Sequence, residues 1–205
     1  SLLLTTGLEE KRAQISSAYD HFKKAGDSEK AEYEKALLDT IDTILSFCDR
    51  YRQEAEKQGN HTVADTLSRI PRQKPQTLLE ALQFMRIIHY CLWCSFNYHN
   101  TLGRFDQYMY PFYKHDIDAG ILTKDTALEL IEEFFISLNR DSDLYTGMQQ
   151  GDNGQSMVLG GMNPDGTDSF NELSDLCLQA SLELKLIDPK INLRVSKKTP
   201  LSTYI

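Results

Sequence analysis

The chain has 205 residues, of which 40% are hydrophobic and 25% charged, as in ordinary globular proteins. Its formal net charge is −8 and its Lys and Arg residues are scattered, which argues against a nucleic-acid-binding protein. No apolar run approaches the roughly 18 residues of a membrane helix, and the four cysteines lie in helical patterns rather than in a disulfide framework. We therefore expect a cytoplasmic protein with reduced thiols, no nucleic-acid partner and no membrane segment.

The first half of the sequence predicts helices. Thr6-x-x-Glu9 is typical of a capping box, and the helix that it opens should end at Gly26. A second helix should start near Asp27 or Ser28 and end at Gly59-Asn60, with a buried stripe formed by Tyr33, Leu37, Ile41, Ile44, Cys48 and Tyr51. A short helix over 61–70 and a proline-containing connector over 71–75 follow.

Thr77-x-x-Glu80 predicts the cap of a third long helix. From Leu82 to Phe96 this helix has no polar face, so we expect protein to surround it. The next stretch, 97–113, mixes polar side chains with six aromatic rings. Buried polar groups cost free energy unless they are paired, so this stretch is either a hydrogen-bonded structural cluster or a functional site.

Helices and strands alternate in the remaining sequence. Pro111 is expected in the first turn of a helix that ends at Gly120, and Thr123 should cap the next helix. A polar loop over 141–155 leads to a strand over 156–160 and a turn over 163–166. Ser169-x-x-Glu172 should cap a helix that ends near Lys185, before a second strand over 191–195. Strand, helix and strand indicate a parallel crossover, which starts an α/β sheet or barrel.

Several short motifs have simple structural explanations. Cys91-x-x-Cys94 has no second pair of zinc ligands and lies within a helix, so core packing is favoured. Gly147, Gly151 and Gly154 lack the order of a phosphate-binding loop and indicate flexibility. Gly160-Gly161 allows either close approach of backbone or ligand, or a tight turn.

Two observations on histidines complete the motifs. His115-Asp116 is interpreted as a solvated helix end, and His99, the one histidine in a strongly apolar stretch, as a core histidine. The sequence contains no metal-binding histidine motif, and we expect no metal site.

The run Gly103-Arg-Phe-Asp-Gln-Tyr-Met-Tyr-Pro-Phe-Tyr113, preceded by Asn97-x-His99, resembles a signature of the glycyl radical enzymes. These form the pyruvate formate-lyase superfamily, and the match is closest to their dehydratase and lyase branch. The resemblance continues through Asp116–Gly120, Leu159–Gly161 with Asp165-Gly166, Asn171–Leu173, and 191–200, so it covers nearly the whole chain.

The resemblance implies a homodimer of helix-clad α/β barrels. A radical-SAM activating enzyme installs a radical on a glycine, and a cysteine thiyl then abstracts hydrogen from a small-molecule substrate, after which a C–C, C–O, C–N or C–S bond breaks. We accordingly expect a mostly helical α/β segment, with 1–140 as a helical layer and 141–205 as the start of the barrel. The first barrel strands would lie near 156–160 and 191–195.

Family members are several times longer, and none of the four cysteines lies in their Cys-x-Glu motif. The resemblance therefore implies a fragment with no catalytic residue and no bound cofactor, whose radical glycine lies outside this segment. Two alternatives remain. The parent could act on pyruvate as a formate C-acetyltransferase, although the Arg-Phe-Asp-Gln-Tyr run differs from that branch. Alternatively, the chain could be a non-catalytic helical interaction module.

Two regions are candidates for substrate binding by resemblance. Asn97-x-His99 resembles the Asn-Gly-His-Ser segment by which dehydratases approach substrate hydroxyls, although Tyr98 and Asn100 replace the glycine and serine. The second region is 154–157, where Gly154 aligns with an aromatic ring of relatives. We expect substrate contacts from His99, Asn100, Gly154, Gln155 and Met157. Structural roles are expected for Asn97, Arg104, Asp106 and Gln107.

Overall fold

The computed structural model describes residues 2–95, 99–140 and 154–200. The chain divides into two compact units, one made of residues 1–76 and 83–91 and the other of residues 77–82 and 92–205. We call them the helical unit and the sheet unit, and helix α5 (Leu78–Cys94) contributes residues to both. Within the described ranges, no helix combines the length and apolar character required to cross a membrane. The expected division near residue 140 stays a prediction.

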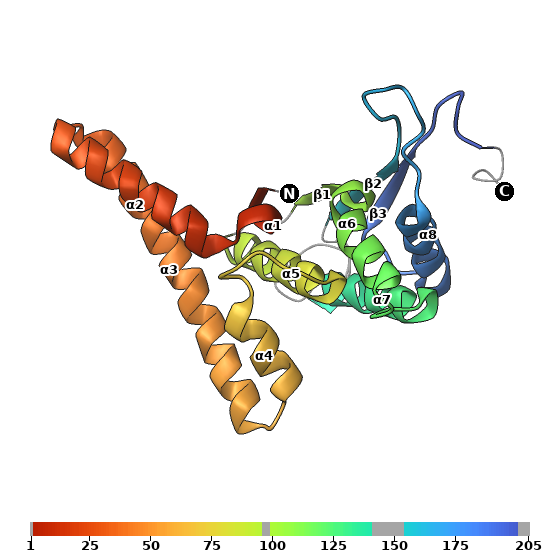
Figure 1. Cartoon of the computed structure of the whole chain (residues 1–205), viewed down its shortest axis with the longest axis horizontal. Helices are drawn as coiled ribbons and strands as arrows, with labels where there is room; N and C mark the ends of the chain where they lie inside the picture. The colour runs from red at the N-terminus through yellow and green to blue at the C-terminus, as the bar shows by residue number, and fades with distance from the viewer. Residues whose placement is uncertain (1, 96–98, 141–153, 201–205) are drawn as a thin grey trace. The chain divides into compact units, whose positions relative to one another are not determined.

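The helical unit contains α1 (Leu2–Thr6), α2 (Leu8–Ala25), α3 (Ser28–Lys57) and α4 (His61–Arg69). Helices α2 and α3 form an antiparallel hairpin (Figure 1). Gly26 closes α2 in the left-handed conformation, and the Asp27 side chain caps α3 by accepting a hydrogen bond from the Lys30 amide. The predicted ends of these helices are confirmed.

The predicted capping box at Thr6 is wrong, because Thr6 ends α1 and Gly7 precedes α2 without a side-chain cap. The first amides of α2 instead donate to backbone carbonyls of the connector: Leu8 to Pro71 and Glu9 to Arg72, both at 3.0 Å. A Cβ on Gly7 would lie 2.5 Å from the Arg72 carbonyl oxygen, so only glycine permits this approach.

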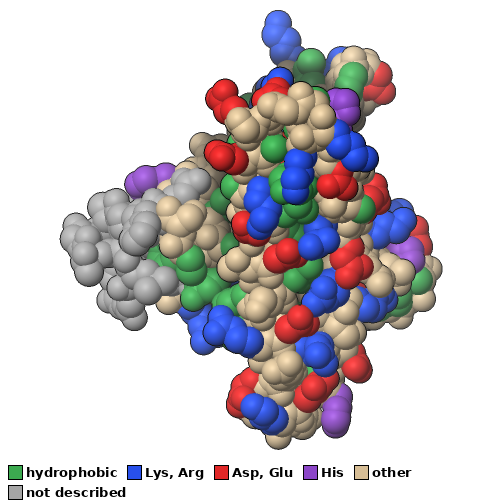
Figure 2. All heavy atoms as spheres, turned by 90° about the vertical axis from the view of Figure 1, so that its left-hand side faces the viewer, with side chains coloured by type: hydrophobic (Ala, Val, Ile, Leu, Met, Phe, Trp, Pro, Cys, Tyr) green, Lys and Arg blue, Asp and Glu red, His purple; other side chains and the backbone are tan. Residues whose placement is uncertain are grey.

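The buried stripe of α3 is only partly as predicted. Ile41 and Cys48 are buried, but Tyr33 and Tyr51 are 64% and 57% exposed. Besides Ile41 and Cys48, the buried positions of this helix are Ala31, Leu38, Leu45 and Ala55, which the predicted stripe did not include. Acidic and basic side chains are interspersed on the face drawn in Figure 2, and Arg12 pairs with Asp42 at 2.6 Å between α2 and α3.

The sheet unit contains a three-stranded parallel sheet in the order β1-β2-β3. Its strands are β1 (Thr101–Arg104), β2 (Ser156–Gly160) and β3 (Lys190–Arg194). Its helices, besides part of α5, are α6 (Phe105–Asp118), α7 (Lys124–Asn139) and α8 (Glu172–Leu184). The prediction of β2 is confirmed at both ends, β3 starts one residue earlier than predicted, and β1 was not predicted.

Four predicted helix starts have different outcomes. Thr77 caps α5 and Thr123 caps α7, as predicted. Pro111 lies inside α6 rather than in its first turn, because this helix already begins at Phe105. Ser169 does not cap α8; the Asn171 side chain accepts from the Leu173 and Ser174 amides at 3.0 Å. An asparagine two residues after the serine therefore supplies the cap.

The two faces of the sheet differ. Met157 and Leu159 are fully buried on the face where α6 packs against β2. Because side chains alternate along a strand, Ser156 and Val158 lie on the opposite face and are partly exposed. Parallel pairing of Val158 with Asn192 extends this opposite face onto β3, where Asn192 is exposed. We call this second surface the open face.

Asp116 is buried rather than solvated, so the interpretation of His115-Asp116 as a solvated helix end is wrong for the carboxylate. One Asp116 oxygen accepts from the Leu78 amide at 2.7 Å, and the other lies 2.9 Å from His115 Nδ1. A carboxylate next to the first amide of α5 stabilises that helix start. Along α5 itself, Phe84 and Trp93 are buried but Leu79 and Leu92 are each 42% exposed, so the described chain surrounds this apolar helix incompletely.

Candidate functional site

The amino-terminal edge of the sheet brings two predicted substrate-contacting regions together. His99 and Asn100 lead into β1, and Gly154 and Gln155 lead into the neighbouring strand β2. The His99 ring lies directly against Gly154, since a Cβ built on Gly154 would be 2.0 Å from His99 Nδ1. Gly154 has a φ of +71°, which favours glycine. An imidazole and a glycine 55 positions apart in sequence thus share one corner of the sheet.

Gln155 is the most unusual polar side chain at this edge. Its backbone carbonyl accepts a hydrogen bond from the Lys190 amide at 2.8 Å, which joins it to the start of β3. Its side chain is fully buried, and neither the amide oxygen nor the amide nitrogen has a partner among the described residues. A buried amide without partners costs about 1–3 kcal/mol, so this side chain is suited to a polar group that the described residues do not supply.

Met157 has a different environment from the other candidates. It is fully buried on the face that α6 covers, together with Leu159. The neighbouring side chains Ser156 and Val158 lie on the open face. If a substrate contacts this strand from the open side, Ser156 and Val158 are therefore better placed than Met157.

The buried histidine of this chain is His89, which sequence reasoning missed, and not His99, which is exposed. The core interpretation of His99 is therefore wrong for this chain. Burial lowers the pKa of His89 to about 4, assisted by the positive charge of Arg86, whose Nη1 lies 3.4 Å from His89 Nδ1. His89 Nε2 has no hydrogen-bond partner within the described part of the chain. His89 is thus neutral near pH 7.

The polar side chains that follow His99 form hydrogen bonds that tie α6 and β1 to the rest of the sheet unit. Arg104 Nη2 donates to the Gly160 carbonyl at 3.1 Å and to Ser169 Oγ at 2.8 Å. Gln107 Nε2 donates to the Ser169 carbonyl at 2.8 Å. Ser169 therefore serves as a partner of Arg104 and Gln107 instead of a helix cap.

Asp106 extends this network into the buried interior. Its fully buried Oδ2 accepts from the Gly160 amide and from Ser174 Oγ, each at 2.6 Å. Its backbone carbonyl accepts from Asn171 Nδ2 at 3.2 Å. Asp106 therefore connects the end of β2 with the start of α8. Asn97, which we grouped with these residues, lies outside the described residues.

The cysteines show no arrangement for chemistry in the described part of the chain. Cys94 is exposed and Cys91 is partly exposed, so the core interpretation of the Cys91-x-x-Cys94 pair is wrong for Cys94. Burial raises the pKa of Cys48 to about 12 and that of Cys177 well above its usual value, so both are inert thiols. In the described ranges, no group of three or more His, Cys, Asp or Glu side chains could hold a metal ion. Gly147 and Gly151 lie outside those ranges.

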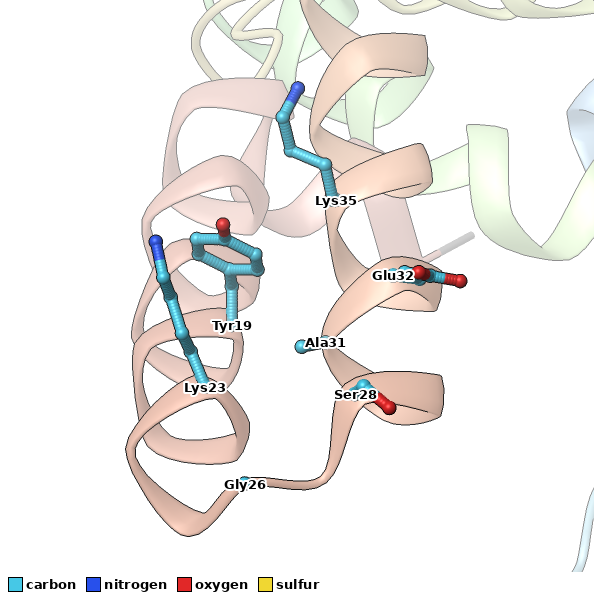
Figure 3. A pocket seen from close by; sticks show the side chains of 7 residues that line it. All are labelled: Tyr19, Lys23, Gly26, Ser28, Ala31, Glu32 and Lys35. Atoms are coloured by element: carbon cyan, nitrogen blue, oxygen red, sulfur yellow. The ribbon is translucent and has the colours of Figure 1, made fainter.

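A hollow at the tip of the α2–α3 hairpin lies in the helical unit. Figure 3 shows Tyr19 and Lys23 rising from α2, and Ala31, Glu32 and Lys35 from α3. Lys23 Nζ lies 5.3 Å from the centre of the Tyr19 ring, and Lys35 pairs with Asp39. Both lysines therefore have partners, and the labelled side chains do not point toward a common position where a ligand would bind.

A family model described as pyruvate formate lyase-like matches residues 1–204. The curated relatives include trans-4-hydroxy-L-proline dehydratase from Clostridioides difficile, 35% identical over 161 residues, which covers 72% of this chain and 20% of that protein. They also include (2S)-3-sulfopropanediol dehydratase from Klebsiella oxytoca, 28% identical over 195 residues, which covers 86% of this chain and 24% of that protein.

The solved structures include a glycyl radical enzyme from Archaeoglobus fulgidus that superposes with a TM-score of 0.87 at 26% identity. The match covers 98% of this chain and 28% of that enzyme chain. The chain therefore spans between a fifth and a third of the length of the relatives that it resembles.

Proposed function

This chain belongs to the pyruvate formate lyase-like family, and from that premise we propose that it forms part of a cytoplasmic glycyl radical dehydratase or lyase. In this proposal it supplies a wall of the substrate chamber, and the radical glycine and thiyl cysteine lie outside these 205 residues. The two dehydratase relatives support cleavage of a C–O bond in preference to acetyl transfer from pyruvate with release of formate. A radical-SAM activating enzyme and a second copy of the parent chain are the proposed partners.

The observation that carries the proposal is the corner formed by His99, Gly154 and Gln155. It combines an exposed imidazole with a buried amide that has no partner among the described residues. An imidazole and an amide can each donate and accept hydrogen bonds, which suits the hydroxyl groups of a dehydratase substrate. The open face beside this corner carries further polar side chains, including Ser156 and Asn192.

Anaerobic activation tests the placement of the radical. Incubation of the 205-residue chain with a radical-SAM activating enzyme, S-adenosylmethionine and a reductant should give no glycyl radical signal in electron paramagnetic resonance. Longer proteins that contain this segment should give that signal under the same conditions. A glycyl radical on the 205-residue chain itself would contradict the proposal that the radical glycine lies outside this segment.

Substitution of His99 tests the proposed corner in the activated parent enzyme. His99→Gln should lower kcat/KM by at least about tenfold, as expected for the loss of a polar substrate contact, and leave the radical yield unchanged. His21→Gln, at an exposed position on α2, is the matched control and should have no effect on kcat/KM. Equal activity of His99→Gln and the unsubstituted enzyme would exclude His99 from substrate binding.

A further inference from the structure

The carboxyl-terminal edge of the sheet holds a second group of residues, at the opposite end of the strands from His99 and Gly154. Arg104 ends β1, Gly160 ends β2 and Arg194 ends β3. Gly154 precedes β2 and Gly161 follows it, so the five residues of that strand separate them. This edge is therefore distinct from the proposed substrate corner.

The two glycines at this edge, Gly160 and Gly161, have different surroundings at the place where a side chain would begin. A Cβ on Gly160 would lie 2.9 Å from the Arg194 carbonyl oxygen, so Gly160 permits close approach of the β3 backbone. The three atoms nearest to a Cβ on Gly161 would all be side-chain atoms, the first of them Arg194 Cβ at 3.5 Å. The other two are Arg194 Nε at 3.6 Å and Arg104 Nη2 at 3.7 Å. The missing side chain of Gly161 thus leaves a space for one atom between two guanidinium groups.

Neither guanidinium group has a carboxylate partner within the described ranges. Arg104 Nη2 is used by the Gly160 carbonyl and Ser169 Oγ, which are neutral, and its buried Nε has no partner among these residues. Arg194 is exposed and makes no side-chain hydrogen bond or ion pair with a described residue. Two nearby positive charges repel each other, so their arrangement favours an anion that contacts both.

Two carboxylates lie close in sequence to this edge, and each accepts hydrogen bonds from neutral groups. Asp106 Oδ2 accepts from the Gly160 amide and Ser174 Oγ. Asp168 Oδ1 accepts from the Phe170 amide, and its Oδ2 accepts from Thr199 Oγ1 at 2.5 Å. These donors are neutral, so both carboxylates keep their negative charge, and Asp106 Oδ1 has no hydrogen-bond partner among the described residues. Neither carboxylate forms a hydrogen bond or ion pair with Arg104 or Arg194 within the described ranges.

We propose that Arg104 and Arg194 form an anion-binding site over Gly161, which accepts one oxygen of a carboxylate, sulfonate or phosphate group between the two guanidinium groups. Arg194 is the accessible side of the site, and Arg104 is the fixed side because its hydrogen bonds to Gly160 and Ser169 hold it in place. Both hydrogens of Arg104 Nη2 are already donated to Gly160 and Ser169, so Arg104 attracts the anion through its charge. Arg194 supplies the charge-assisted hydrogen bond to the oxyanion. The proposal does not depend on the radical chemistry proposed above.

Titration of the purified protein with sodium acetate, methanesulfonate and inorganic phosphate at constant ionic strength tests this site. Isothermal titration calorimetry should show saturable binding of at least one of the three anions, and the anion bound most tightly identifies the ligand class. In two-dimensional NMR spectra the Gly161 amide should shift with the same dissociation constant. Absence of saturable binding for all three anions would overturn the proposal.

Variants distinguish a specific anion-binding site from non-specific attraction of anions by the positive charges of the surface. Arg194→Gln should weaken binding at least tenfold, whereas Arg194→Lys keeps the charge and should retain part of the affinity. Lys197→Gln removes one exposed positive charge three residues away and should leave the affinity unchanged. Equal weakening by Arg194→Gln and Lys197→Gln would show that only net charge matters and would refute the site. Because Arg194 is exposed and makes no side-chain hydrogen bond to a described residue, its substitution should not prevent folding.

Discussion

At the scale of single residues, the contact between His99 and Gly154 determines what a substitution at position 154 can report. Gly154→Trp would be the direct test of the expectation, drawn from the family resemblance, that position 154 borders a substrate chamber. Even the first side-chain atom at this position would overlap the His99 ring, because it would lie 2.0 Å from Nδ1. Any larger side chain therefore displaces His99 first, and a change in KM could not be assigned to chamber volume alone.

Gly154→Ala measures this contact directly. A positive φ costs about 1–2 kcal/mol for a residue with a Cβ, and displacement of His99 should add to that cost. Gly120→Ala is the matched control, because Gly120 has a similar φ of +68° and nothing within 4 Å of its Cβ position. Urea denaturation should show a larger loss of stability for Gly154→Ala. Equal losses would mean that His99 moves away freely.

His89 should make stability depend on pH. Its pKa is about 4 in the folded protein and near 6.5 when unfolded, so between these values the unfolded state binds more protons. Stability should therefore fall as the pH decreases from about 6.5 to 4, by up to about 3 kcal/mol from this residue. Unfolding free energies of the protein and of His89→Leu, measured across this range, should differ in slope.

His21→Leu serves as the control for this pH series, because His21 is exposed on α2. Its unfolding free energy should follow the same pH dependence as the unsubstituted protein. If His89→Leu also keeps that dependence, His89 is protonated in the folded state at pH 5 and its burial is weaker than the structure indicates.

At the scale of elements, the start of α2 depends on its approach to the connector. Gly7→Ala places a methyl group 2.5 Å from both the Arg72 carbonyl oxygen and the Gln73 carbonyl carbon, which are backbone atoms. We expect a loss of more than about 2 kcal/mol, because this backbone also accepts the first two hydrogen bonds of α2. Gly26→Ala, with φ of +75° and open space around its Cβ position, should lose only about 1–2 kcal/mol in urea unfolding.

Asp106 should be the most sensitive connection between the sheet and its helices. Asp106→Ala leaves the Gly160 amide and the Ser174 hydroxyl without their acceptor in a buried environment, at a cost of about 2–6 kcal/mol. Asp106→Asn retains an oxygen acceptor and should lose less. Thermal unfolding followed by circular dichroism compares the two variants. A similar loss for both would indicate that the negative charge, and not the acceptor, is required.

At the scale of the whole molecule, the sequence predicted elements where local signals were strong. Helix ends at Gly26 and Asp27, the Thr77 and Thr123 caps, and both ends of β2 follow from residues adjacent to the element. Strand β1 could not be found this way, because Thr101–Arg104 is only four residues long and has no alternating apolar pattern.

The same limit applies to the predicted site: local sequence patterns do not reveal contacts between residues that are far apart in the sequence. The family resemblance predicts substrate contacts from His99 and Gly154, but the contact between these two residues depends on the pairing of β1 with β2. Arg194 gave no local signal, since its relation to Arg104 arises only when the ends of three strands meet. Ser169 was assigned to a cap because serine before Glu172 fits a local pattern, whereas Arg104 and Gln107 bind it from far away in the sequence.

The pairing of β1 with β2 also has a consequence for the order of folding. Thr101 and Ser156, which are hydrogen-bonded across these strands, are 55 residues apart, whereas only Gly26 and Asp27 separate α2 from α3. Closing a long loop costs more entropy than closing a short one, and contacts between distant residues slow folding. The helical hairpin should therefore gain hydrogen-exchange protection early in refolding. The corner that joins His99 to Gly154 should be among the last parts of the chain to form.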